Sequence, residues 1–240
     1  MAYSVFEKIK NQAALLHNDI ISFLGRLIEA KSLSAEEENC AGIILNEMRK
    51  LGYDEAFLDP MGNVIGRIGK GRHIIAFDGH IDTVDGGNIS LWNTDPFKAV
   101  IQDDKIFGRG AVDQKGGVAS MIYAGKIIKD LGIDDIFTVY ITGTVQEEDC
   151  DGLCWQYIFN EDKIKPEFLI ITEPTGLKLN RGQRGRMEIE ISTVGISAHG
   201  SMPERWQNAI YRMSPVIADI EKLNDRLLND DFLGKGSVAI

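Results

Sequence analysis

Hydrophobic positions near the N-terminus recur at helical spacing. Between residues 5 and 30, apolar side chains return every three or four positions, which predicts one long amphipathic helix. A second helix is predicted from Ser34 to Leu51. Ser34 and Glu37 have the spacing of a capping box, in which the two side chains satisfy each other's backbone N–H groups. Gly52 follows where a helix C-terminus would place a glycine.

Short apolar runs then alternate with further helical patterns. Strands are predicted at 63–68, 73–78, 136–142 and 168–172, helices at 118–131 and 153–160, and a loop at 92–105. The last three strand runs are apolar through their middles, which is typical of strands buried on both faces. This order predicts an α/β fold with a mixed, largely parallel sheet flanked by helices.

The pattern changes after Arg181. Polar and apolar residues alternate over 186–193, which predicts a strand with one face in water. A helix over 203–228 and a strand beginning at 237–240 follow. We therefore predict two domains, one over 1–183 and an α+β domain over 184–240 that is begun but not finished.

Charge and composition exclude several classes of partner. The net charge is −10, whereas nucleic acids and anionic membranes require clustered Lys and Arg. The chain has no apolar run of membrane-spanning length and no signal-peptide pattern at its N-terminus. Its cysteines are Cys40, Cys150 and Cys154, too few for a disulfide framework or a paired zinc site. These features predict a cytoplasmic protein that has neither nucleic acid nor membrane as partner.

Candidate chemistry gathers where the predicted strands end. His80 and Asp82 follow the strand at 73–78, Glu147 and Glu148 follow the strand at 136–142, and Glu173 follows the strand at 168–172. Asp113 stands in a glycine-rich turn before a helix. Open α/β sheets bind ligands beyond the carboxyl ends of their strands. We therefore expect these side chains to share one site.

The donor types indicate a metal site. Imidazole and carboxylate groups from His80, Asp113, Glu148 and Glu173 suit zinc, and also cobalt or manganese. Asp82 lies on the same side of an extended backbone as His80 and can hold its second nitrogen. Taken singly, each residue has an ordinary explanation, such as a half-buried histidine or a solvated helix start. Their coincidence after successive strands favours a site.

Five motifs resemble those of the acetylornithine deacetylase and succinyl-diaminopimelate desuccinylase family, which are di-zinc amidohydrolases related to aminoacylase and carboxypeptidase G. The metal-site motifs are 79–84, 108–117, 146–148 and 172–175, and the lid motif is 195–203. Segments 145–155 and 181–186 are most similar to the branch called selenium-metabolism-linked hydrolases. The resemblance implies a catalytic domain interrupted by a dimerising lid, and hence a homodimer.

The resemblance also implies two divalent metal ions and a set of ligands. Asp113 would bridge the ions, His80 and Glu173 would complete one of them, and Glu148 would bind the other. Zinc is the first expectation, with cobalt and manganese as alternatives. Asp82 would orient His80.

Two further residues would act directly on the reaction. Glu147 would be the general base that deprotonates the water held between the metals. His199, on the lid, would reach into the active site of a partner subunit and stabilise the oxyanion.

The chain departs from the family at two points. Gln114 stands where the family usually has methionine, a change that we expect to lie outside the metal ligands. The family's chains are longer and carry another metal histidine, which belongs with Glu148. His17 and His73 lie in a helix and at a strand start, and neither matches it. We therefore expect a C-terminally truncated form or a fragment.

The expected function is metal-dependent hydrolysis of an amide bond in a small N-acyl amino acid or peptide-like substrate. One alternative keeps the same site in a dipeptidase. Another is a truncated, non-catalytic protein that binds metal or dimerises.

Overall fold

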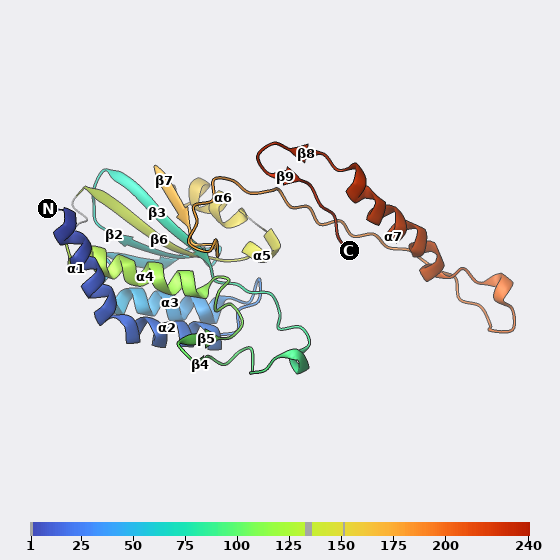
Figure 1. Ribbon diagram of the computed structural model, residues 1–240, viewed down its shortest axis with the longest axis horizontal. Coiled ribbons are helices and arrows are strands. Elements are labelled where there is room, and N and C mark those ends of the chain that lie inside the picture. The colour runs from blue at the N-terminus through green and yellow to red at the C-terminus, as the bar shows by residue number, and fades with distance from the viewer. Residues whose placement is uncertain (1, 133–135, 151) are drawn as a thin grey trace. The chain divides into compact units, whose positions relative to one another are not determined.

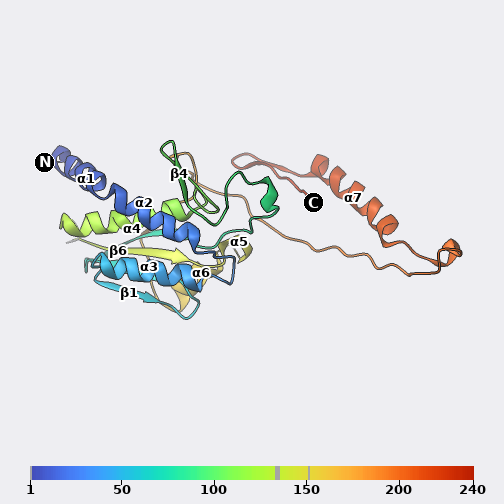
Figure 2. The same cartoon turned by 90° about the horizontal axis from the view of Figure 1, so that it is seen from below.

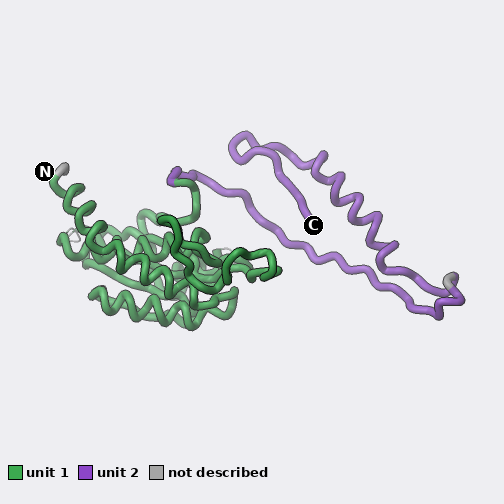
Figure 3. The backbone as a smooth tube through the Cα atoms, turned by 60° about the horizontal axis from the view of Figure 1, so that its bottom comes forward, with its two compact units in different colours: residues 1–176 green, residues 177–240 purple. Residues whose placement is uncertain are grey.

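The chain divides into two compact units, residues 1–176 and 177–240 (Figure 3). The computed structural model describes residues 2–132, 136–150 and 152–240. The predicted boundary between the domains 1–183 and 184–240 divides the chain by expected function, and it stays a prediction. Within the described ranges, no helix is both long enough and apolar enough to span a bilayer.

The first unit is built on a five-stranded mixed sheet with the strand order β1-β2-β6-β3-β7. The pairings β1–β2 and β2–β6 are antiparallel, and β3 pairs parallel with both β6 and β7. The strands are β1 Glu55–Leu58, β2 Val64–Ile68, β3 His73–His80, β6 Phe137–Thr144 and β7 Phe168–Ile171. The predicted mixed α/β sheet is confirmed.

Helices cover both faces of the sheet (Figures 1 and 2). The main core joins α2 His17–Glu29, α3 Glu38–Lys50 and α4 Lys115–Asp130 to one face, and α6 Leu153–Asn160 packs on the other. Neighbouring residues of β2 show the division, because Val64 belongs to the main core whereas Ile65 packs with Trp155 of α6. Alternate side chains of a strand point to opposite faces, so β2 contributes apolar side chains to the cores on both faces of the sheet.

The single N-terminal helix predicted over residues 5–30 is wrong. The structure has α1 Ala2–Leu15, then a break at Leu16, then α2. No glycine or proline marks the break. The two helices differ in packing: α2 buries Phe23 and Leu27, whereas none of the α1 side chains that the structure describes is buried. Tertiary packing, which the periodicity does not encode, therefore sets the boundary.

The predicted capping box is also wrong. Helix α3 begins at Glu38, and Ala35 has a φ of 68°, which interrupts a helix at that point. The Ser34 hydroxyl and the Glu37 carboxylate form hydrogen bonds to distant parts of the chain instead of capping the helix. The predicted C-terminus is confirmed, since Gly52 follows with a φ of 77°.

The remaining strands of the first unit differ from the prediction in two ways. The loop predicted over 92–105 contains β4 Val100–Gln102, which forms a hairpin with β5 Lys105–Phe107. Asp103 and Asp104 make its turn, both with positive φ, as a two-residue turn of type I′ requires. Strand β7 is exposed rather than buried, because it lies at the sheet edge with β3 as its one neighbour among the described strands.

The second unit contains one long helix, α7 Ala209–Arg226. It begins later than the predicted residue 203, because the Asn208 side chain caps it by accepting hydrogen bonds from the N–H groups of Ile210 and Tyr211. The short helix η2 Pro203–Arg205 precedes it. Another short helix, η1 Ile89–Leu91, belongs to the first unit.

Neither predicted strand of the second unit forms. Residues 186–193 are extended but unpaired within the described part of the unit, and 237–240 are not a strand. The ladder that the structure shows there joins β8 Asn229–Asp230 to β9 Gly234–Lys235. Alternating polarity describes which face of a strand prefers water, but a strand also needs a hydrogen-bonding neighbour.

Candidate metal and catalytic site

Three adjacent parallel strands bring the candidate residues together. His80 is the last residue of the middle strand, β3. On one side β6 leads into the short helix α5 Glu147–Cys150, and on the other β7 leads to Glu173. Asp113 stands just before α4. The expectation that the strand ends share one edge of the sheet is confirmed by the parallel pairing of β3 with β6 and β7.

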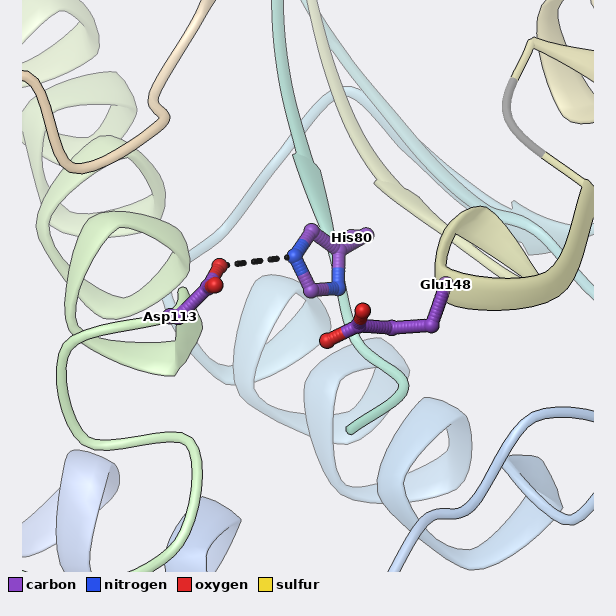
Figure 4. A group of neighbouring side chains, drawn as sticks. All are labelled: His80, Asp113 and Glu148. Carbon is purple, nitrogen blue, oxygen red and sulfur yellow. Dashed lines mark hydrogen bonds and ion pairs between the residues drawn. The ribbon is translucent and has the colours of Figure 1, made fainter. Parts of the chain in front are cut away.

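Carboxylates surround one nitrogen of His80. Its Nε2 lies 3.0 Å from Oδ1 of Asp113, and 3.8 Å from both Oε2 of Glu147 and Oε1 of Glu173. One ligand atom from each of His80, Asp113 and Glu148 lies within 4.8 Å of the other two. Figure 4 shows Asp113 and Glu148 reaching toward the imidazole from different elements. All four expected metal ligands and the expected base therefore converge on one point.

The second nitrogen of His80 is held from behind. Nδ1 lies 2.9 Å from the backbone carbonyl oxygen of Asp82 and 3.4 Å from its carboxylate Oδ1. A carbonyl oxygen can only accept a hydrogen bond, so Nδ1 donates a proton to it. This arrangement directs Nε2 toward the carboxylates, as in metal sites where a partner fixes the imidazole tautomer.

The pKa values report a crowded anionic site. Burial lowers the pKa of His80, but the hydrogen bonds to Asp82 and Asp113 and the charge of Glu147 outweigh it and raise the pKa to about 10. Burial raises the pKa of Glu173, and the charges of Asp113 and Glu148 raise it further against the attraction of His80. Carboxylates this close repel one another unless a cation lies among them.

The chemistry of the donors fits a divalent ion. Imidazole nitrogen with carboxylate oxygens is the donor set of many catalytic zinc sites. The proton that the raised pKa keeps on His80 is one that a metal ion would displace on binding. His80 is only 2% exposed, and its partner Asp82 is fully buried, so packing fixes the orientation of the imidazole ring.

Asp82 does more than face His80. Its carboxylate accepts hydrogen bonds from the backbone N–H groups of Glu147 and Glu148, each at 3.1 Å. It thereby caps α5 from another element, and an anionic side chain is favoured at a helix N-terminus. The same carboxylate therefore connects His80 to the residues expected as base and ligand.

Sequence reasoning missed one residue that contacts the site and one that supports the turn beside it. Gln114 is fully buried, its side-chain amide donates to the Glu173 carboxylate, and its oxygen accepts a hydrogen bond of 2.7 Å from Thr172. One sign of this contact was available in the sequence, because a glutamine stands where the family usually has methionine. Lys115 is also buried, and its ammonium donates to the carbonyl oxygens of Leu27 and Ala30 at 2.7 and 2.9 Å. This contact joins α2 to the turn that carries Asp113.

His199 belongs to the second unit. Its ring is exposed, and Nδ1 lies 2.7 Å from the Ser201 hydroxyl. Its expected role in a partner subunit's site stays a proposal.

Comparisons with known proteins place these features in a family. The profile of peptidase family M20/M25/M40 matches residues 76–222. An uncharacterized protein, YgeY, from Escherichia coli K12 is 51% identical over 98% of this chain, and an acetylornithine deacetylase from Buchnera aphidicola is 38% identical over 71% of it.

The solved structure of an M20 family metallo-carboxypeptidase from Sulfolobus solfataricus has a TM-score of 0.55 and 26% identity, covering 65% of this chain and 36% of that one. The chain spans 58% of the length of YgeY and 45% of the deacetylase. The family resemblance expected from the motifs is confirmed.

Proposed function

Because the chain belongs to peptidase family M20/M25/M40, we propose that it hydrolyses an amide bond in a small N-acyl amino acid or peptide-like substrate. Two divalent metal ions would assist, with zinc as the proposed native ion and cobalt or manganese as alternatives. The observation that carries the proposal is the convergence of Asp113, Glu147 and Glu173 on Nε2 of His80.

The proposed ligands divide between the two ions. His80 and Glu173 would hold one ion, Glu148 would hold the other, and Asp113 would contact both. When bound, the ions would act as Lewis acids that polarise the amide carbonyl and make water more acidic. Asp82 supports this arrangement, because it holds His80 from behind and fixes the backbone beside Glu148.

Glu147 is the proposed general base. Its Oε2 lies 3.8 Å from Nε2 of His80, and its backbone N–H donates a hydrogen bond to the Asp82 carboxylate. It would accept a proton from the attacking water and pass it to the leaving nitrogen. The C–N bond breaks, a C–O bond to the water oxygen forms, and the products are a carboxylate and an amine.

The second unit is the proposed lid of a homodimer. His199 of the partner subunit would stabilise the oxyanion that develops on the substrate carbonyl. Two observations support this: the His199 ring is exposed, and the extended segment 186–193 presents exposed apolar side chains, among them Met187 and Ile189. Exposed apolar surface of this kind favours association with another chain.

The test is an assay of the purified protein loaded with zinc, cobalt or manganese. Substrates would be N-acetyl and N-succinyl amino acids alongside dipeptides, so that a deacylase and a dipeptidase give different profiles. Glu147→Gln should lower kcat by about 10²–10⁴-fold with metal content unchanged. Glu7→Gln, a change on the exposed surface of α1, is the matched control.

Two results would contradict parts of the proposal. Loss of bound metal in Glu147→Gln would show that this residue is a ligand rather than the base. Binding of two metals without turnover of any substrate would favour the non-catalytic alternative.

A further inference from the structure

The linker between α2 and α3, residues 30–37, contacts the site although it lies outside the segment that the family profile matches. The Ser32 hydroxyl donates a 2.7 Å hydrogen bond to the carbonyl oxygen of Ile81. In return, the N–H of Thr83 donates to the carbonyl oxygen of Ser32 at 2.8 Å. The linker is therefore bonded on both sides of Asp82, the residue between these two partners.

Ser34 extends this attachment to the Asp82 side chain. Its hydroxyl donates a 2.7 Å hydrogen bond to Oδ2 of Asp82, the oxygen that also accepts from the N–H of Glu148. The other oxygen, Oδ1, accepts from the N–H of Glu147 and faces His80. A fully buried carboxylate with donors on both oxygens has one favoured orientation.

The polar side chains of the linker form these hydrogen bonds and do not cap helix α3. The Glu37 carboxylate accepts a 2.9 Å hydrogen bond from the N–H of Gln146, just before α5, instead of capping α3. Between Ser34 and Glu37, Ala35 has a left-handed φ of 68°, a conformation that is unfavourable for residues with a Cβ. Departures from local preference of this kind are typical of functional sites.

We propose that Ser34 is a positioning residue of the active site. Through the Asp82 carboxylate it holds the backbone N–H groups of Glu147 and Glu148, and so it sets how the proposed base and the proposed ligand face His80. The catalytic part of this inference rests on the proposed function. Its structural part, the hold on α5, does not.

Backbone hydrogen exchange tests the structural part without any activity. In the metal-free protein, Ser34→Ala should speed exchange of the Glu147 and Glu148 amides by roughly tenfold, because Oδ2 of Asp82 loses a donor and the carboxylate can turn. Ser34→Thr keeps the hydroxyl and should restore protection. Ser120→Ala is the control, since the Ser120 hydroxyl bonds to the Gly116 carbonyl on the exposed surface of α4.

Activity tests the catalytic part. With metal bound, Ser34→Ala should lower kcat about tenfold, the loss expected for one hydrogen bond to a charged group, and leave KM within about twofold. Unchanged exchange at Glu147 and Glu148 would overturn the proposal, whatever the activity. A lower melting temperature with faster exchange throughout the chain would also overturn it, since it would show a general structural role. A wild-type protein without turnover would instead contradict the proposed function and leave the exchange result intact.

Discussion

Nε2 of His80 and Oδ1 of Asp113 lie 3.0 Å apart, although 33 positions separate the two residues in the chain. His80 ends strand β3, and Asp113 stands just before helix α4, which packs on one face of the sheet. The contact therefore exists only when α4 is docked on β3. The predictions below concern the groups that hold this arrangement in place.

Asp82→Asn should weaken metal binding by about 10–100-fold, as changes behind a metal histidine do. The substitution keeps the size of the side chain but replaces one acceptor oxygen with a donor. That donor would face either His80 or the N–H groups of α5. Competition with a chromophoric chelator measures the affinity, and Asp85→Asn, on an exposed carboxylate, is the control. Equal affinity in both variants would contradict the role of Asp82.

Gln114→Met places the family's usual residue at this position and should weaken metal binding about tenfold. The side-chain amide of Gln114 donates to Glu173, and a thioether has no proton to donate. The Glu173 carboxylate would then lose a hydrogen-bond donor while the negative charges of Asp113 and Glu148 remain beside it. Gln102→Met, on the exposed β4 hairpin, is the control. Tighter binding in Gln114→Met would show that the amide competes with the metal for Glu173.

Glu47 should make the stability of the first unit depend on pH. Its buried carboxylate accepts hydrogen bonds from Tyr123, Lys50 and Arg26. Burial raises the pKa of Glu47, but these three hydrogen bonds outweigh burial and lower the pKa below its usual value. Because the folded pKa lies below the unfolded one, the network stabilises the fold above the unfolded pKa. That contribution is lost as pH falls through the folded pKa.

Glu47→Gln should therefore lower the free energy of unfolding by about 2 kcal/mol near neutral pH. Its difference from the wild type should shrink as pH falls below the unfolded pKa of about 4.3, and should be smallest below the lowered folded pKa, where the wild-type carboxylate is protonated in both states. Urea unfolding at several pH values measures both effects, with the exposed Glu38→Gln on the same helix as control. A difference that grows on acidification would mean that the folded pKa is raised rather than lowered.

Mixing two impaired variants tests the proposed role of His199. His199→Ala and Glu147→Gln should each be impaired alone. If His199 acts in the site of the other subunit, subunit exchange creates dimers in which one site has both an intact base and an intact histidine. Activity should therefore rise on mixing. Activity that stays at the level of the separate variants, in a mixture shown by mass spectrometry to contain mixed dimers, would place His199 in its own subunit's site or outside catalysis.

The sequence by itself determined the class of fold and which of the candidate residues meet at one edge of the sheet. Uniformly apolar runs predict strands buried in an α/β sheet, and the runs at 73–78 and 136–142 became β3 and β6. The carboxyl ends of parallel strands meet at one edge, so residue order alone was enough to expect His80 beside Glu147 and Glu173. The motifs that carry these residues also identified the family, because each motif combines reactive residues with the turn that presents them.

Only the tertiary structure decided which partner each polar group takes. Ser34 and Glu37 have the spacing of a helix cap, but their hydrogen bonds go to Asp82 and Gln146, residues far along the chain. In the second unit, alternation at 186–193 is present without a partner strand, so the described unit has no ladder there. Periodicity records which face of a segment avoids water, whereas hydrogen bonds are directional and depend on what packing brings within about 3 Å. That information lies in the assembled sheet and helices rather than in any one segment of the sequence.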